Sequence, residues 1–336
     1  MRRFSTGLVV GKFAPLHLGH ERVIQTALDH CDHVVLLSYS RPEFPGCEPR
    51  RRTAWLAARF PQTIRIVLDS ATEALPANDE SDDTHRAFCA SILQRYVNRP
   101  IDAIFTSEGY GPGFAADLAR RQGAPVAHVP VDPPRDEYPV SGTQLRANLH
   151  EMRHFLAPEV YGTFVERIAL LGGESTGKST LAAALADELG TTYVAEYGRE
   201  RWLEKNGELA FEDLLAIAEE QIRREEAALL DRATDRFLVC DTTPLTTLFY
   251  SHEWFGRADD RLIDLARRHY HHIFLCADDV PFFQDGTRAD SAFRMKGQEW
   301  YRNQLEIGSY RDVSGGLEIR VAQVLAAIEA RRIHPR

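Results

Sequence analysis

The sequence predicts an α/β protein made of two doubly wound parallel-sheet domains, a Rossmann-like domain followed by a P-loop domain. The chain has 336 residues, and a domain holds roughly 150 residues, so two domains are expected. In both halves, short runs of Val, Leu and Ile alternate with helical patterns, which is typical of buried parallel strands joined by helices. A Gly-containing loop follows the first apolar run of each half, at residues 11–20 and 172–179. We expect the first domain to span residues 1–158 and the second to span residues 165–336.

The composition excludes several classes of protein. Apolar residues make up 44% of the chain, which is enough for two ordinary cores. The 40 Lys and Arg residues and the 49 Asp and Glu residues give a net charge of −9, which argues against a basic nucleic-acid coat or a polybasic membrane anchor. There is no signal-peptide pattern and no long apolar run, and the five cysteines share no CxxC spacing. We expect a cytoplasmic protein that binds small molecules, not nucleic acid or membranes, and a homo-oligomer is possible.

In the first half, five apolar runs alternate with four helical patterns. Each run is short and nearly continuous, so we expect strands buried on both faces, with ligands at their carboxyl ends. The expected strands are residues 7–10, 33–37, 64–68, 101–105 and 126–129. The expected helices are residues 18–30, 50–60, 84–98 and 114–122.

The second half repeats this alternation. Three histidines, His269, His271 and His272, lie close together before its fourth strand, but neighbours in a strand alternate faces, so we expect surface or edge positions. The expected strands are residues 167–171, 192–195, 237–240 and 273–275, with a weaker one at 317–319. The expected helices are residues 178–189, 211–233 and 321–332.

Residues 172–179 read GGESTGKS and fit the phosphate-loop pattern GxxxxGK[ST] in full. Glycines let backbone N–H groups approach phosphate oxygens closely, Lys178 would reach the β- and γ-phosphates, and Ser179 would ligate Mg²⁺. An apolar strand precedes the loop and a helix follows it, which is the context that this motif requires. We therefore expect a nucleoside triphosphate at this loop.

Two carboxylates follow later strands of the second half. Asp241 comes directly after the run at 237–240, where a Mg²⁺-associated carboxylate is expected, although it could simply cap the next turn. Glu196 follows the second strand and would act as a general base if the acceptor is an alcohol. The alternative for Glu196 is a salt bridge to Arg199 or Arg201.

Two arginines follow the fourth expected strand of the second half. Arg288 ends the segment 285–288, and Arg294 lies six residues further along the chain. On a mobile segment they could close over the transferring phosphoryl group. The alternative is a solvated loop.

The loop of the first half reads GKFAPLHLGH at residues 11–20. His17 and His20 lie at the start of a helix, where imidazole donors and the positive end of the helix can meet a phosphate. Gly19 lets the backbone approach a nucleotide. The two histidines could instead bind zinc, but no third ligand lies at a matching spacing.

The first half ends with a second motif, SGTQLR at residues 141–146. Ser141 is a good N-cap, and hydroxyls and amides at a helix start suit a phosphate. Arg146 follows about one turn later and would face the same anion. Alone the motif is weak, but paired with the loop at 11–20 it is specific.

These motifs resemble those of a known superfamily. The patterns GxFxPxHxGH and SxTxxR are similar to those of nucleotidyltransferases that adenylylate small phosphorylated acceptors. The stretches at 44–49, 105–111, 172–178, 196–199 and 241–247 extend the resemblance to the NadR-type bifunctional family. That family joins nicotinamide mononucleotide (NMN) adenylyltransferase to ribosylnicotinamide kinase. Some members carry an N-terminal helix-turn-helix repressor segment, which we do not expect here because the first strand begins near residue 7.

The resemblance implies a two-step route to NAD. The second domain would transfer the γ-phosphoryl group of ATP to the 5′-hydroxyl of nicotinamide riboside, giving NMN. The first domain would let the NMN phosphate attack the α-phosphorus of a second ATP, giving NAD and pyrophosphate. Mg²⁺ would assist, held in the second domain by Ser179 and Asp241.

The motifs and the resemblance together assign site residues. The expected catalytic residues are Lys12, His17, His20 and Arg146 in the first domain and Lys178, Glu196 and Asp241 in the second. ATP would contact Gly11, Phe13, Gly19, Glu108, Ser141 and Thr143 in the first domain. ATP in the second domain would contact Gly172, Gly173, Glu174, Ser175, Thr176, Gly177, Ser179, Thr180 and Arg288.

The resemblance also suggests NMN contacts in the first domain. Phe44 and Trp55 could stack on the nicotinamide ring, and one of Arg50, Arg51 and Arg52 could meet the NMN phosphate. A core position for the aromatic rings and a solvated basic face are the open alternatives. Two other functions also stay open: an adenylyltransferase for another acceptor, such as nicotinate mononucleotide or phosphopantetheine, and an ATP- and NAD-sensing regulator with little turnover.

Overall fold

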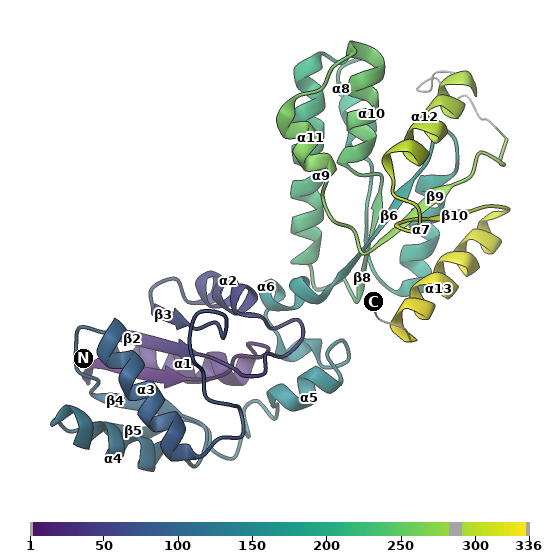
Figure 1. The fold of residues 1–336 in the computed structure, drawn as a ribbon. Coiled ribbons are helices and arrows are strands. Elements are labelled where there is room, and N and C mark those ends of the chain that lie inside the picture. Colours follow the sequence, from purple (N-terminus) through teal and green to yellow (C-terminus); the bar gives the residue numbers. More distant parts are fainter. Residues whose placement is uncertain (1–2, 282–290, 334–336) are drawn as a thin grey trace. The chain divides into compact units, whose positions relative to one another are not determined.

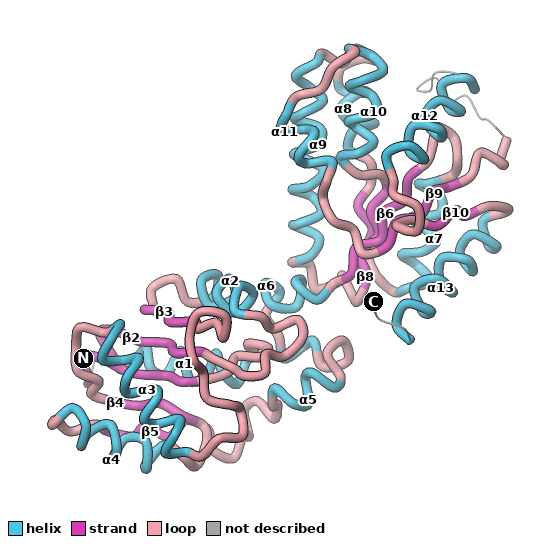
Figure 2. The backbone as a smooth tube through the Cα atoms, viewed as in Figure 1, coloured by secondary structure: helices cyan, strands magenta, loops and turns pink. Residues whose placement is uncertain are grey.

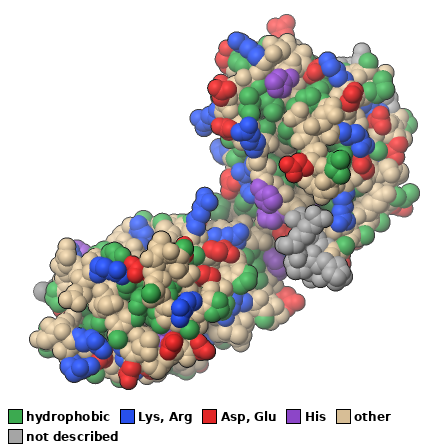
Figure 3. Space-filling view, in the orientation of Figure 1, with side chains coloured by type: hydrophobic (Ala, Val, Ile, Leu, Met, Phe, Trp, Pro, Cys, Tyr) green, Lys and Arg blue, Asp and Glu red, His purple; other side chains and the backbone are tan. Residues whose placement is uncertain are grey.

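Ten parallel strands, five in each half of the chain, form the framework of the computed structural model, which describes residues 3–281 and 291–333. The chain divides into two units, Met1–Phe164 and Val165–Arg336. Helices pack against each sheet (Figure 1, Figure 2), and the predicted class of two doubly wound parallel α/β domains is confirmed. Acidic and basic side chains are interspersed on the face of each unit shown in Figure 3. Within the described residues, no helix is both long and apolar enough to cross a membrane.

The sheet of the first unit has the strand order β3-β2-β1-β4-β5. Its strands are β1 (Phe4–Val10), β2 (Cys31–Ser38), β3 (Ile64–Val67), β4 (Ala103–Thr106) and β5 (Ala127–Pro130). The helices are α1 (Leu18–His30), α2 (Pro49–Arg59), α3 (Asp82–Tyr96), α4 (Gly111–Gln122), α5 (Gly142–Ala147) and α6 (Pro158–Tyr161). The strand order reverses between β1 and β4, and ligands of doubly wound sheets bind at the carboxyl ends of strands at such a point.

Apolar side chains on the strands of the first unit explain why these segments form a buried sheet. Leu8 of β1 and Ile104 of β4 are completely buried, and they belong to one apolar cluster with Ile92 of α3 and Leu118 of α4. Burying such side chains removes apolar surface from water, which is the main driving force for folding. The core therefore lies between the sheet and its helices, and it leaves the carboxyl ends of β1 and β4 free to carry polar loops.

The sheet of the second unit has the strand order β10-β9-β6-β8-β7. Its strands are β6 (Glu166–Leu171), β7 (Tyr193–Val194), β8 (Phe237–Asp241), β9 (His272–Cys276) and β10 (Arg311–Val313). The helices are α7 (Lys178–Leu189), α8 (Tyr197–Glu204), α9 (Phe211–Leu229), α10 (Pro244–Phe255), α11 (Asp260–Ala266), α12 (Ser291–Gln304) and α13 (Leu317–Ile333). The phosphate loop follows the central strand β6.

One expected strand of the second unit is wrong. Residues 317–319 open helix α13, and the edge strand is β10 at Arg311–Val313. Leu317 and Ile319 are exposed, whereas Val324 and Ile328, one turn apart on the same helix, are buried in the core. The apolar residues therefore follow the helical period of 3.6 and not the alternation of a strand.

The expectation for the three histidines is wrong for one of them. His269 is exposed and His271 is half-buried, but His272 is buried. It lies on β9, which pairs with strands on both sides. The ring nitrogen Nε2 of His272 is 2.8 Å from a carboxylate oxygen of Glu166, so this side chain is a partner in a buried polar pair.

Candidate nucleotide sites

The first unit contains a cavity of about 510 Å³ at the carboxyl ends of β1 and β4. Segments distant in sequence line it, among them the loop after β1, the loop after β4 and the start of α5. All the catalytic and ATP-binding residues expected in this unit line the cavity. These are Gly11, Lys12, Phe13, His17, Gly19, His20, Glu108, Ser141, Thr143 and Arg146, joined by Phe44.

His17 and His20 form a closed pair at the start of α1. Each Nδ1 accepts the backbone N–H of the other residue, at 3.3 and 3.4 Å, and the two rings stack with centroids 3.6 Å apart. In a neutral ring whose Nδ1 accepts a hydrogen bond, the proton lies on Nε2. Each neutral ring therefore carries an N–H donor at its outer nitrogen.

Burial keeps these two rings uncharged at neutral pH. Burial, reinforced by the charge of Arg135, lowers the pKa of His17 to about 4. Burial and then the neighbouring His17 and Arg135 hold the pKa of His20 well below its usual range. A Cβ atom on Gly19 would lie 3.1 Å from the His17 ring, so a glycine is what allows the ring to pack against the helix start.

Two cations share the face of one aromatic ring in this cavity. The Arg146 guanidinium carbon lies 3.8 Å from the centroid of Phe44, and Lys12 Nζ lies 5.9 Å from it. Arg146 also donates to the Ala14 carbonyl at 2.5 Å and to the Thr143 hydroxyl at 3.1 Å. Burial and the neighbouring Arg146 lower the pKa of Lys12. Lys12 and Arg146 therefore place two positive charges in the cavity, where they could bind a polyanion.

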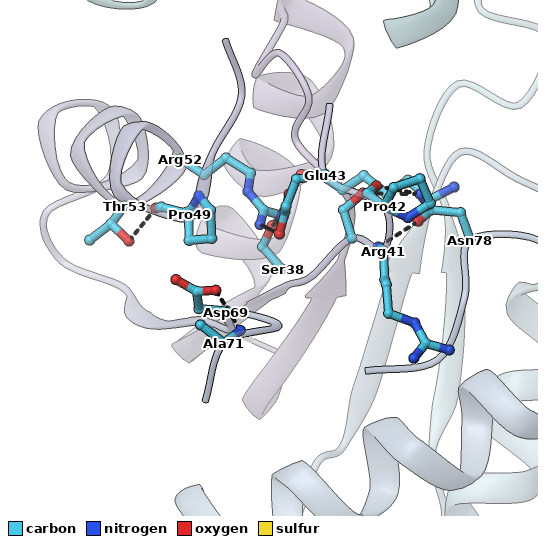
Figure 4. Close-up of polar contacts among 12 residues, drawn as sticks. Ser38, Arg41, Pro42, Glu43, Pro49, Arg52, Thr53, Asp69, Ala71 and Asn78 are labelled. Atoms are coloured by element: carbon cyan, nitrogen blue, oxygen red, sulfur yellow. Dashed lines mark hydrogen bonds and ion pairs between the residues drawn. The ribbon is translucent and has the colours of Figure 1, made fainter. Parts of the chain in front are cut away.

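Arg52, one of the three arginines of which one could meet the NMN phosphate, does not line this cavity. Its side chain is completely buried, and its guanidinium donates to Ser38 Oγ at 3.0 Å and to the Lys12 carbonyl at 3.3 Å. It also pairs with Glu43 at 2.8 Å (Figure 4). Arg52 therefore joins the backbone of Lys12 to the loop that carries Phe44.

The other residues of α2 expected at NMN also lie outside the cavity lining. Trp55 is 1% exposed, donates from Nε1 to Thr163 Oγ1 at 3.2 Å and packs against Phe164. Arg51 donates to the Thr163 carbonyl at 2.9 Å, and Arg50 is exposed. Trp55 therefore occupies a core position, which was the alternative to stacking on the nicotinamide ring, and it lies on the buried face of its helix.

Several residues that line the cavity belong to no sequence motif, Arg135, Tyr39 and His85 among them. Arg135 lies in the loop after β5, has a φ of 60°, and its guanidinium is 3.3 Å from a carboxylate oxygen of Glu108. Tyr39 and His85 face the same cavity and are hydrogen-bonded at 2.9 Å. They come from separate loops and helices, so only the tertiary fold brings them to the site.

The second unit contains a cavity of about 470 Å³ next to its phosphate loop. All residues of the loop that were expected at ATP, together with Glu196, line this cavity: Gly172, Gly173, Glu174, Ser175, Thr176, Gly177, Lys178, Ser179 and Thr180. Lys178 Nζ donates to the carbonyls of Gly172 and Gly173 at 3.0 and 2.9 Å. The loop bends through left-handed backbone at Gly172, Ser175 and Gly177, which turns its amide groups inward.

The phosphate loop is held from behind by two buried side chains. Gln298 of α12 accepts the N–H of Gly173 at 3.1 Å and donates to the Cys276 carbonyl at 3.1 Å. Arg320 of α13 donates to the Thr176 carbonyl at 2.6 Å. These contacts fix the loop before any ligand binds, so a triphosphate would meet a preorganised cradle.

Asp241 is buried and Glu196 is half-buried, and the two carboxylates lie close enough beside the loop to influence each other. Burial and the charge of Asp241 raise the pKa of Glu196. Burial also raises the pKa of Asp241, against the opposing effects of Lys178 and a hydrogen bond from Ser179. Oδ1 of Asp241 has no hydrogen-bond partner among the described residues. A buried oxygen of this kind next to a hydroxyl fits a divalent cation such as Mg²⁺.

Of the two arginines that could pair with Glu196, Arg201 has other partners and Arg199 lies in the same cavity. Arg201 bonds instead to Asp213 at 2.9 Å and to Glu204 at 3.2 Å. Arg199 lines the same cavity as Glu196, and its charge lowers the pKa of that carboxyl against the larger effect of burial. Glu196 therefore remains a cavity carboxylate.

The rest of this cavity is a largely apolar wall that the sequence did not reveal. Helices α8, α9, α10 and α12 and the loop before α9 contribute it. Tyr250 donates to a carboxylate oxygen of Glu174 at 3.0 Å. Its apolar and aromatic members are Trp202, Leu209, Leu214, Ile217, Phe249, Tyr250, Trp254 and Tyr301. Such a wall suits the flat ring of an acceptor.

The two expected lid arginines have different outcomes. Arg288 lies outside the described residues. Arg294 is 5% exposed, and its guanidinium donates to the Val280 carbonyl at 2.9 Å. Its backbone carbonyl lies so close to the phosphate loop that a Cβ on Gly173 would be 2.4 Å away. Arg294 thus packs behind the loop and not over the cavity.

Comparison with known proteins agrees with this fold and these loops. Residues 167–320 match the family model of an AAA domain. The chain is 27% identical over 308 residues to the trifunctional NAD biosynthesis/regulator protein NadR of Salmonella typhimurium, covering 86% of this chain and 72% of that protein. Over 306 residues it is also 27% identical to the protein of the same name from Escherichia coli, covering 85% of this chain and 72% of that protein.

Two crystal structures of NadR proteins share the fold across 98% of this chain and 97% of theirs. The one in complex with NAD and AMP-PNP has a TM-score of 0.67 at 20% identity. The one in complex with NR has a TM-score of 0.71 at 19% identity. The chain is therefore similar to the NadR proteins over most of its length, and the resemblance that its motifs indicate is confirmed.

Proposed function

We propose that the chain is a bifunctional NAD salvage enzyme with one reaction in each unit. The second unit transfers the γ-phosphoryl group of ATP to the 5′-hydroxyl of nicotinamide riboside, giving NMN. The first unit transfers the adenylyl group of ATP to NMN, giving NAD and pyrophosphate. The observation that carries the proposal is the presence of two cavities, each lined by its own phosphate-binding loop. The NadR names and complexes support the choice of ligands.

In the second unit, the acceptor is an alcohol and must lose a proton. Glu196 takes this proton as general base, because its raised pKa makes it a stronger base than an exposed carboxylate. Lys178 leaves its two loop carbonyls and neutralises charge on the transferring phosphoryl group. The apolar wall binds the ring of the acceptor and keeps water away from the reacting oxygen.

Ser179 and Asp241 are the residues that would hold Mg²⁺ in this unit. The unpaired Oδ1 of Asp241 and the adjacent hydroxyl are oxygen ligands of the kind that this ion prefers. When bound, the ion neutralises charge on the β- and γ-phosphates of ATP.

In the first unit, the nucleophile is a phosphate that is already ionised. No base is needed, so catalysis consists of positioning and of stabilising charge on the α-phosphate and on pyrophosphate. His17 and His20 supply neutral N–H donors, while Lys12 and Arg146 supply positive charge. The start of α1 adds its own positive end.

One assay with two variants tests both reactions. Purified protein is given nicotinamide riboside, ATP and Mg²⁺, and NMN and NAD are quantified by chromatography. Lys178→Ala should abolish formation of NMN but leave conversion of supplied NMN to NAD intact. His20→Ala should do the reverse. Formation of neither product by the unmodified chain would refute the proposal, and loss of both reactions in one folded single variant would refute the assignment of one reaction to each unit.

A further inference from the structure

One side chain in the wall of the second cavity has an unsatisfied donor. Gln221 of α9 is 3% exposed and lines the cavity with Leu214 and Ile217, which lie seven and four residues before it, respectively, on the same face of the helix. Its Oε1 accepts the backbone N–H of Tyr197 at 3.0 Å. Its Nε2 has no hydrogen-bond partner among the described residues.

A buried amide with one free end is costly, because its donor has lost water and gained nothing in return. Most buried side-chain polar atoms in proteins have a partner. Leu or Met at position 221 would fill the same space without this cost, as Leu214 and Ile217 do along the same helix face. A polar ligand in the cavity would satisfy the donor.

The position of Gln221 indicates which end of a ligand it would meet. The hydrogen bond to Tyr197 fixes the amide at the start of α8, directly after Glu196. The amide therefore lies near the carboxylate that receives the proton of the acceptor. The aromatic side chains of Trp202 and Trp254 belong to the apolar part of the wall, where a flat ring fits. The group near Gln221 should thus belong to the sugar of the acceptor and not to its base.

We propose that Nε2 of Gln221 donates a hydrogen bond to a secondary ribose hydroxyl of the acceptor and thereby selects ribosides over deoxyribosides. This inference rests on the proposed kinase reaction of the second unit. It adds a residue that selects the sugar, whereas the phosphate loop acts on the transferred group and Glu196 on the attacking hydroxyl. A site built to bond a hydroxyl discriminates against an analogue without it, because the buried donor then stays unpaired.

The test compares acceptors within each variant of the full chain. Nicotinamide riboside and its 2′-deoxy and 3′-deoxy analogues are phosphorylated by the unmodified chain, by Gln221→Met and by Gln221→Glu. Gln221→Met keeps the length of the side chain but removes the amide. Gln221→Glu keeps the oxygen that accepts from Tyr197 and replaces the donor. Gln304→Met, at an exposed position of α12, is the matched control.

The unmodified chain should prefer the riboside over one of the deoxy analogues by about 10–100-fold in kcat/KM. In Gln221→Met this ratio should fall to within about threefold of one, and in Gln304→Met it should not change. Gln221→Glu should lower kcat/KM for the riboside, because its carboxylate can accept a hydrogen bond from the hydroxyl but cannot donate one. Dissociation constants from calorimetry should show the same loss of discrimination in Gln221→Met. A ratio that stays at its original value in Gln221→Met overturns the inference, as does equal use of all three acceptors by the unmodified chain.

The outcome also separates this inference from the proposed function. Turnover of the riboside by the unmodified chain is measured first, and its absence refutes the kinase reaction and this inference together. Turnover with unchanged discrimination refutes only the role of Gln221. If Gln221→Met fails to fold, which a changed circular dichroism spectrum would reveal, the ratio in Gln221→Leu, which also lacks the donor, decides.

Discussion

The two cavities differ in the charges and protonation states of the side chains that the proposed reactions would use. In the first, the donors are neutral imidazoles whose pKa values lie below the usual range, and the charges come from Lys12 and Arg146 around Phe44. In the second, the loop that carries Lys178 lies beside two carboxylates, Glu196 and Asp241, with raised pKa values. Neutral donors suffice where the attacking group is already ionised, whereas an alcohol needs a base. The difference between the cavities thus follows the difference between the two proposed nucleophiles.

The largest expected effect concerns the base of the second cavity. Glu196→Gln keeps the shape of the side chain but cannot accept a proton, so kcat for phosphorylation of the riboside should fall about 10²–10⁴-fold. The KM for ATP should change little, because the phosphate loop is held by Gln298 and Arg320. Adenylyl transfer to NMN should be unaffected. An unchanged rate of phosphorylation in this variant would contradict the assignment of a general base to the second cavity.

The next effect concerns the imidazole pair of the first cavity. His17→Asn keeps a good N-cap for α1 but removes the ring that stacks on His20. The kcat of adenylyl transfer should fall about 10²–10³-fold, as when one donor to a developing negative charge is lost. Thermal stability, measured by differential scanning calorimetry, should change little. A large loss of stability with little loss of rate would instead assign His17 a purely structural role.

The rates of the two reactions should depend differently on pH, because one uses a carboxylate base and the other uses uncharged imidazoles. The base form of Glu196 is lost as pH falls through its raised pKa, so phosphorylation should decline about tenfold per pH unit below that value. This decline should begin at a higher pH than for an exposed carboxylate. Adenylyl transfer between about pH 5 and pH 8 should follow the substrate phosphates, whose second pKa is about 6, with no step from an imidazole, because the pKa of His17 is about 4. A step near pH 6.5 that disappears in His17→Asn would show that this imidazole titrates normally.

Local motifs predicted the two loops that line the cavities but not the walls around them. Lys178 and His17 belong to contiguous patterns whose meaning depends on one strand and one helix. Arg135 and Gln221 reach their cavities only because distant segments pack together, so no window of sequence contains the signal. For Trp55 the sequence suggested a ligand contact that the structure does not show. A helical pattern does not reveal which face of the helix lines a cavity, and the Trp55 side chain instead bonds to Thr163.

The smallest expected effect is on the free energy of unfolding and concerns Glu166, which lines neither cavity. Glu166 binds His272 and Arg236 at 2.8 and 2.9 Å. These partners outweigh the effect of burial and lower the pKa of Glu166 from 4.5 to about 2. The stabilisation is complete above the unfolded pKa near 4.5 and is lost as pH falls toward 2. Glu166→Gln should therefore cost about 1–3 kcal/mol at pH 7 and progressively less in acid.

Glu225, in the same unit, provides a control of opposite sign. Burial raises its pKa to about 7 in spite of Arg268 and Tyr270. A carboxyl whose folded pKa is raised loses stability as pH rises from its unfolded value through its folded one. The effect of Glu225→Gln on the free energy of unfolding should thus become more favourable from pH 5 to pH 8, while that of Glu166→Gln stays unfavourable. Urea unfolding across this range and down to pH 3 measures both, and parallel pH profiles for the two variants would contradict the assigned shifts.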